Sequence, residues 1–164
     1  MVRRKKNKAS DGPLAGKLDM NTVGCSGHSM GGIESEQAII IDKRVKTSIL
    51  NNSGDLGHSA MSHIPDGKSI AIVYGIKGME KFNAELDYGN PKVKVPACLI
   101  MMDGGEYGHG CGPWDGMAVT VSWFRWQLGG ESFRKADFVG SSGKYINGPI
   151  IGHDGNWKGQ CKNF

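Results

Sequence analysis

Thr22-Val-Gly-Cys-Ser-Gly-His-Ser-Met-Gly-Gly32 is the stretch of sequence that decides the fold. Its first residues, up to Ser26, are compatible with a short strand, and the residues from Met30 to Ile41 are compatible with a helix. The glycine-rich segment between them therefore predicts a sharp strand-to-helix turn. A strand that runs directly into a helix is typical of a sheet built from parallel strands.

The rest of the chain alternates in the same way. Short apolar segments rich in Val, Ile and Thr recur along it, and each is followed by a helix-compatible or loop-like segment. This alternation predicts an α/β fold with a mostly parallel sheet and flanking helices. Further strands are expected at Val45–Leu50, Ser69–Tyr74 and Ala97–Met102, and further helices at Met79–Tyr88, Pro113–Leu128 and Glu131–Phe138.

One of these helices, Pro113–Leu128, shows a helical spacing of apolar residues. A stripe of this kind is the face that a helix normally turns toward a core. The stripe consists of Met117, Val121, Phe124 and Leu128.

Composition divides the 164 residues into three parts. Residues 1–15 are a basic tail, residues 16–140 carry the α/β core, and residues 141–164 are expected to be an irregular C-terminal tail. No aromatic residue interleaves with the basic run and no nucleic-acid motif follows it, so a solvated tail without a specific nucleic-acid partner is favoured over a DNA-binding arm. The net charge of +4 is concentrated in this run, at Arg3, Arg4, Lys5, Lys6 and Lys8.

Several classes of protein are disfavoured by the sequence. No apolar run reaches the ~18 residues that a membrane span needs, and no signal peptide is recognisable after the basic run. No two cysteines have C-x-x-C spacing, so neither zinc nor another cofactor is predicted. Cys25 and Cys98 are expected to be buried thiols, whereas Cys111 and Cys161 are candidates for pairing in an oxidising compartment.

The turn itself points to a nucleophile. Gly27-His-Ser-Met-Gly31 has the G-x-S-x-G pattern, in which a serine is lifted above the sheet in a strained conformation. Glycines two positions before and two positions after Ser29 are expected because side chains there would clash. The pattern predicts Ser29 as a nucleophile and the Met30 backbone N–H as an oxyanion donor at the positive end of the following helix.

A nucleophilic serine needs a base, and His109 is the strongest candidate among five histidines. It follows the last predicted core strand, in Asp103-Gly-Gly-Glu-Tyr-Gly-His109, and a helix comes after it. His28 lies inside the turn and is expected to be structural. His58 and His63 lie in a polar loop, and His153 lies in the predicted tail.

Four segments together resemble a group of secreted microbial and fungal α/β-hydrolases, related to dienelactone-hydrolase-like, cutinase-like and feruloyl-type esterases. The resemblance covers roughly Leu14 to Phe138. It implies an α/β-hydrolase fold, a Ser-His-Asp triad and hydrolysis of a small-molecule or polymeric carboxylic ester. The segments are Gly24–Gly32, Arg44–Gly54, Tyr107–Gly110 and Trp123–Leu128.

The resemblance places the acid of the triad shortly after Tyr74-Gly75, where Ile76–Met79 contains no aspartate. Glu80 is the nearest carboxylate and is the first candidate. Asp87 lies one helix later, and the absence of an acid is the third alternative. Asp103 lies six residues before His109, on the wrong strand for the usual arrangement.

The resemblance also implies strands before the turn and a loop that donates a second oxyanion N–H. No H-G-G-G-type loop occurs here, so we expect the chain to be the C-terminal half of such a fold. A sheet lacking those strands would have an exposed edge, suited to self-association. The alternative function is therefore a non-catalytic or truncated hydrolase-fold remnant that acts as a binding module. Proteins of the group that the chain resembles are commonly secreted, but the sequence itself does not indicate the cellular compartment.

Overall fold

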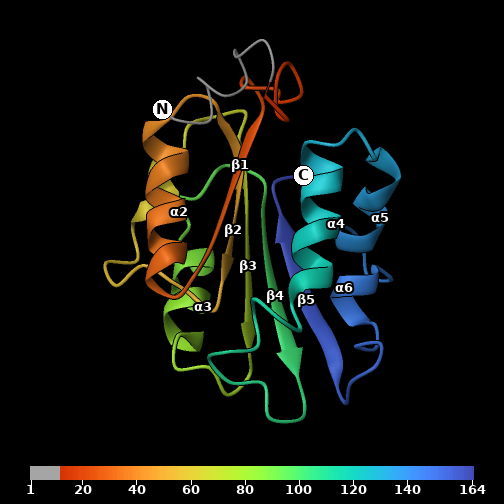
Figure 1. Cartoon of the computed structure of the whole chain (residues 1–164). Coiled ribbons are helices and arrows are strands. Elements are labelled where there is room, and N and C mark those ends of the chain that lie inside the picture. The colour runs from red at the N-terminus through yellow and green to blue at the C-terminus, as the bar shows by residue number, and fades with distance from the viewer. Residues whose placement is uncertain (1–11) are drawn as a thin grey trace.

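A computed structural model describes residues 12–164, and a five-stranded sheet forms its centre (Figure 1). The strands lie in the order β1-β2-β3-β4-β5. The first four are parallel to one another, and β5 is antiparallel to β4. The predicted α/β class with a mostly parallel sheet is confirmed. The strands are β1 (Val23–His28), β2 (Val45–Asn51), β3 (Ser69–Gly75), β4 (Ala97–Asp103) and β5 (Asn156–Lys162).

Helices cover both faces of the sheet. One layer contains α2 and α3, and the other contains α4, α5 and α6 (Figure 1). Short 3₁₀ turns η1 and η2 lie in the connections. Because β2 and β3 are covered on both faces, nearly every residue in them is buried, as expected for central parallel strands. The bounds are α2 (Met30–Ile41), η1 (Ala60–His63), α3 (Lys81–Gly89), α4 (Met117–Gln127), η2 (Ser132–Arg134), α5 (Lys135–Phe138) and α6 (Lys144–Asn147).

The sheet divides the core into two clusters. The cluster on the α2 and α3 side is mainly aliphatic and includes Ile39, Leu50 and Ile72. The cluster on the α4 side combines aliphatic residues of the strands with several aromatic side chains. In it, Trp123 packs edge-on against Phe138 at 5.4 Å between ring centroids, a preferred geometry for aromatic pairs. The two clusters lie on opposite faces of the sheet. The carboxyl ends of the four parallel strands lie together at one end of it.

The expectation of an irregular tail at residues 141–164 is wrong. This segment contains α6 and β5. Only Trp157 of β5 is buried, because β5 is an edge strand whose other residues, most of them polar, are exposed or half-buried. A polar edge strand lacks the apolar run that identified the central strands.

The expectations that Cys98 is a thiol and that Cys111 pairs with Cys161 are wrong, whereas Cys25 is a free thiol as expected. Cys161 on β5 is bonded to Cys98, the residue directly opposite on β4. Cys111 and Cys25 are free thiols. The disulfide therefore joins the one antiparallel strand to the parallel sheet.

The apolar stripe predicted for α4 faces the core only in part, since Phe124 packs against the core cluster on the α4 side. Met117 and Val121 are about half exposed, whereas Val119 and Trp123 are buried. The helix is oriented by Trp123, whose indole N–H donates to the Thr47 hydroxyl at 2.7 Å inside the core.

The predicted basic tail is only partly visible, because the run from Arg3 to Lys8 lies outside the described residues. Between Gly12 and the C-terminal Phe164, no helix combines the length and the apolar character that a membrane crossing requires.

Candidate functional site

Ser29 occupies the sharp turn between β1 and α2. Its backbone has φ 55° and ψ −124°, a region that residues other than glycine seldom adopt. The turn is fixed by two hydrogen bonds. The Ser29 N–H donates to the Asn51 carbonyl at 3.1 Å, and the Ser53 hydroxyl donates to the Ser29 carbonyl at 2.7 Å. The Ser29 side chain makes no capping bond to α2, so its hydroxyl is not engaged by the helix.

The glycines of the turn differ in what they allow. A Cβ atom on Gly27 would overlap the Gly31 carbonyl, and one on Gly32 would overlap the Ser53 side chain. A Cβ atom on Gly31 would meet nothing within 4 Å. The expectation that the position two residues after Ser29 must be glycine is therefore wrong, and the crowded position is Gly32.

The loop between β4 and α4 brings His109 to the same edge of the sheet. This loop approaches the ends of the parallel strands closely, because a Cβ atom on Gly75 would overlap the Tyr107 carbonyl. The end of β1 also holds the loop, since Nε2 of His28 lies 2.7 Å from the His109 carbonyl. His28 thus has the structural role that the sequence suggested, and it acts on the backbone of His109.

The structure pairs His109 with one of the candidate acids. Nδ1 of His109 lies 2.8 Å from Oε2 of Glu80, whose side chain is only 7% exposed. Asp87 is engaged elsewhere, because its carboxylate accepts a hydrogen bond from Nδ1 of His58 at 3.1 Å. Asp103 forms an ion pair with Lys158. Glu80 is therefore the carboxylate that orients the His109 ring.

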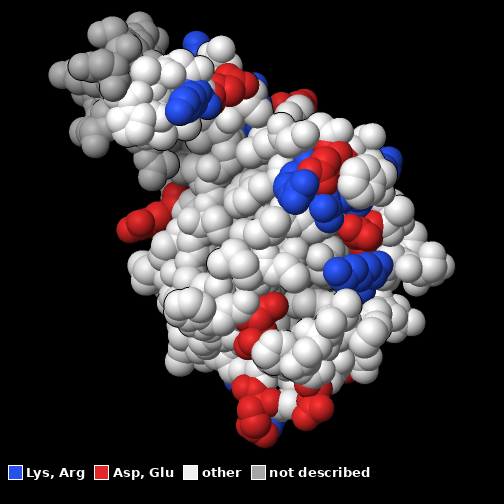
Figure 2. All heavy atoms as spheres, turned by 45° about the vertical axis from the view of Figure 1, so that its right-hand side comes forward, with Lys and Arg blue, Asp and Glu red and all other residues white. Residues whose placement is uncertain are grey.

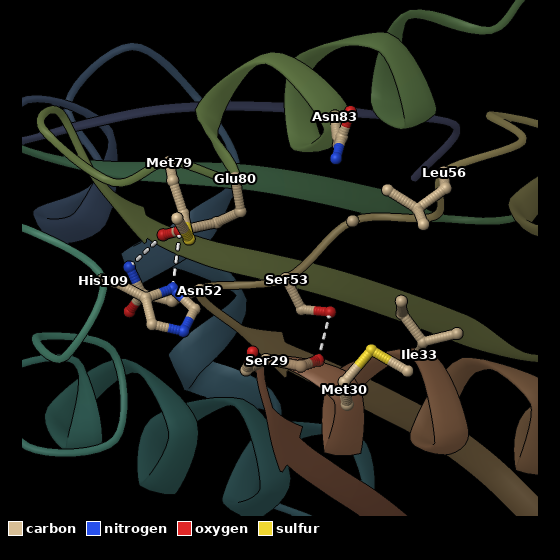
Figure 3. A pocket seen from close by; sticks show the side chains of 11 residues that line it. Ser29, Met30, Ile33, Asn52, Ser53, Leu56, Met79, Glu80, Asn83 and His109 are labelled. Atoms are coloured by element: carbon tan, nitrogen blue, oxygen red, sulfur yellow. Dashed lines mark hydrogen bonds and ion pairs between the residues drawn. The ribbon is translucent and has the colours of Figure 1, made fainter.

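Ser29, Met30, Glu80 and His109 line one pocket of about 250 Å³. Figure 3 shows the His109 ring with Nδ1 toward Glu80 and its opposite edge toward Ser29. No hydrogen bond joins the Ser29 hydroxyl to His109 in this arrangement. Apolar side chains, Ile33 and Leu56 among them, line the far side of the pocket. All four residues selected from the sequence are thus brought together.

Asn52 is a pocket residue that the sequence did not single out. It is fully buried directly after β2 and donates a hydrogen bond to the Glu80 carboxylate. In the sequence it opens a long polar loop, where asparagine is ordinary. The only local sign was its place directly after a buried strand, at the same edge of the sheet as Ser29.

Burial changes two ionisable groups near this edge. It raises the pKa of the Cys111 thiol to about 11, which disfavours the thiolate that a cysteine nucleophile requires. Burial also raises the pKa of Glu36 on α2 to about 8, with the charges of Asp87 and Asp55 adding to the effect. Within residues 12–164 no cluster of three or more His, Cys, Asp or Glu side chains is arranged to hold a metal ion.

The fold and the site place the chain in the class of mostly parallel α/β proteins with a pocket at the carboxyl ends of the strands, lined by apolar side chains around Ser29, Glu80 and His109. The chain matches no protein-family model, and no curated protein matches it significantly.

Proposed function

We propose that this chain is a serine hydrolase that acts on carboxylic esters and carries part of an α/β-hydrolase fold. The observation that supports this most strongly is the combination of two features in one pocket. Ser29 is held at a left-handed strand-to-helix turn, and His109 is held by a buried carboxylate on the side of its ring away from Ser29. Nucleophile, base and orienting acid are the three groups that acyl transfer by a serine requires.

In the proposed reaction the Ser29 hydroxyl attacks the ester carbonyl while Nε2 of His109 takes its proton. Glu80 accepts a hydrogen bond from Nδ1–H of His109, which fixes the tautomer that leaves Nε2 free to act as a base. His109 then protonates the departing alcohol, and an acyl-enzyme remains on Ser29. Water attacks this ester with His109 again acting as the base, and the carboxylic acid leaves.

The negative charge that develops on the carbonyl oxygen is stabilised by the start of α2. The first N–H groups of a helix have no acceptor within the helix and carry partial positive charge. Met30 directly follows the nucleophile, so its N–H is the donor closest to the reacting carbonyl. The Ser29 hydroxyl and His109 move into hydrogen-bond contact when the ester binds, as is common for catalytic pairs that are loose without substrate.

The proposal is tested with a fluorophosphonate probe, which labels an activated serine. We expect the label on Ser29, located by mass spectrometry, and its loss in Ser29→Ala. Ser142→Ala removes an exposed serine before α6 and is expected to label like the original protein. A folded protein that takes no label would refute the proposal.

Self-association through the edge of β1 is a second candidate, and it does not depend on catalysis. In the described part of the chain β1 ends the sheet, and its residues Val23–His28 include no charged side chain to block pairing. Phe124 of α4 and Leu128, directly after this helix, reach Gly24 of β1. The exposed side chains of Met117 and Val121 continue this apolar surface along the helix.

A second copy is the proposed occupant of this edge. Figure 2 shows a broad uncharged area on the α4 side of the molecule. Antiparallel pairing of β1 with β1 about a two-fold axis would place the two α4 helices on the same face of the joined sheet. We expect sedimentation velocity to show a concentration-dependent dimer that Val121→Lys abolishes. Ile151→Lys, which alters an exposed apolar residue near the C-terminus, should leave the dimer intact, and a monomer at all concentrations would exclude this candidate.

A further inference from the structure

Asn52 has an unusual backbone and no exposed surface. Its φ is 46°, in the left-handed region that asparagine tolerates better than most residues. Its N–H donates to the Val73 carbonyl at 2.7 Å, which ties the position to the end of β3. The backbone therefore directs the Asn52 side chain to a fixed place at the edge of the sheet.

The side-chain amide of Asn52 lies between Glu80 and the loop that carries His109. Its Nδ2 donates to Oε1 of Glu80 and, at 3.1 Å, to the Gly108 carbonyl. Its Oδ1 accepts from the Gly112 N–H. The Cys111 sulfur lies 3.6 Å from both ends of the amide.

These partners leave the amide one sensible orientation. A flipped amide would turn its oxygen toward a carboxylate and a carbonyl, and its N–H groups toward the N–H of Gly112. The two carboxylate oxygens of Glu80 then have different hydrogen-bond partners. Oε2 accepts a hydrogen bond from Nδ1–H of His109, and Oε1 accepts one from the Asn52 amide N–H.

We propose that Asn52 is a positioning residue for the hydrolase chemistry, acting on His109 through Glu80. This inference rests on the proposed function of the same pocket. A carboxylate held only by His109 could rotate and release the ring, whereas one held at both oxygens has a single orientation. The Gly108 carbonyl is bound by the same amide, so the loop next to His109 and its acid are fixed to one group.

The groups that titrate around this amide come from three elements. Glu80 directly precedes α3, His28 ends β1, and His109 and Cys111 lie on the loop after β4. Asp115 lies further along that loop, and its negative charge contributes to the raised pKa of Cys111.

Asn52→Asp keeps the shape of the side chain and gives a test that depends on pH. When protonated, the new carboxyl group can donate to Glu80 in place of the amide N–H. When it ionises, two carboxylates face each other and the hydrogen bond is lost. We expect the ratio of its fluorophosphonate labelling rate to that of the original protein to fall as pH rises from 5 to 9, by about 10²-fold, the loss typical of a misplaced catalytic group.

The matched control is Asn163→Asp. Asn163 also has a left-handed backbone, at φ 64°, and its amide donates to the Val93 and Val95 carbonyls. It contacts none of the pocket residues. The labelling ratio for Asn163→Asp should stay near one at every pH, and a constant ratio for Asn52→Asp as well would overturn the inference.

A double-mutant cycle gives a second, independent readout. Asn52→Ala should slow labelling of the original protein strongly and that of the Glu80→Ala variant by a clearly smaller factor, which reflects the lost bonds to the loop, because groups that act in series are not additive. Equal factors in both backgrounds would show that Asn52 does not act through Glu80. If the original protein takes no label at all, the proposed function fails and this inference falls with it.

Discussion

Oε2 of Glu80 accepts a hydrogen bond from Nδ1 of His109 across a separation of 29 positions in the sequence. The glutamate lies between β3 and α3 and the histidine lies after β4, so the contact depends on the pairing of β3 with β4. The carboxyl group is buried, whereas the ring is more than one-third exposed in the pocket. A buried acceptor behind an accessible imidazole fixes the tautomer and leaves the outer nitrogen available to a substrate.

Replacing Glu80 should therefore reduce the reactivity of Ser29 without removing it. We expect Glu80→Gln to slow fluorophosphonate labelling by up to about 10⁴-fold, the loss seen when a triad acid becomes an amide. The measurement is the second-order rate constant of labelling. Glu34→Gln, which changes an exposed carboxylate on α2, should label at the original rate, and a loss below tenfold for Glu80→Gln would argue against its role.

The two glycines around Ser29 should respond differently to alanine. Gly27→Ala places a methyl group against the Gly31 carbonyl, and we expect the free energy of unfolding to fall by about 1–3 kcal/mol, as for other overpacked sites. Gly31 lies in α2, and the methyl group added by Gly31→Ala would meet no atom within 4 Å. This variant should raise the free energy of unfolding by up to about 1 kcal/mol. Urea denaturation of both variants checks this, and equal destabilisation would contradict the geometry of the turn.

The parallel sheet could be predicted from the sequence because its central strands are continuous apolar runs. Ser69–Gly75 is buried along its whole length, and such a segment stands out from the polar loops around it. Ser29 and His109 could be predicted as site residues because each lies in the segment that follows a predicted strand. The strand β5 was missed because Asn156–Lys162 pairs through its backbone and buries almost only Trp157.

Contacts that depend on tertiary structure could not be predicted from the local sequence. The orientation of α4 follows Trp123, although the stripe that includes Met117 and Val121 is equally apolar. The choice of Glu80 over Asp87 depends on where α3 begins and on which histidine each carboxylate meets. The role of Asn52 requires three partners that lie 28 to 60 positions away.

The disulfide should make a large contribution to stability. Cys98 and Cys161 enclose 63 positions of sequence, and closing a loop of this size stabilises a fold by about 4 kcal/mol through the entropy of the unfolded chain. We expect Cys161→Ser to lower the free energy of unfolding in urea by roughly 2–5 kcal/mol and to remove the effect of a reducing agent. Cys25→Ser alters a free thiol and should preserve the response to reduction.

Glu36 should make the stability of the protein depend on pH. Its side chain is fully buried on α2, and neither carboxyl oxygen has a hydrogen-bond partner in the described chain. The pKa of Glu36 is raised from 4.5 to about 8 by burial and by the negative charges of Asp87 and Asp55. His58, which is hydrogen-bonded to Asp87, is the nearby group that can offset those charges.

The sign of the effect follows from proton binding. Between pH 4.5 and about 8 the folded protein holds the Glu36 proton and the unfolded chain does not, so the free energy of unfolding decreases as pH rises through this window. Glu36→Gln is neutral at every pH and should be more stable than the original protein at pH 8, by on the order of a few kcal/mol, with the difference shrinking toward pH 4.5. Urea denaturation at several pH values measures it. Glu34→Gln should show a small difference that does not vary with pH, and a Glu36→Gln curve parallel to that of the original protein would mean that Glu36 is charged in the folded state.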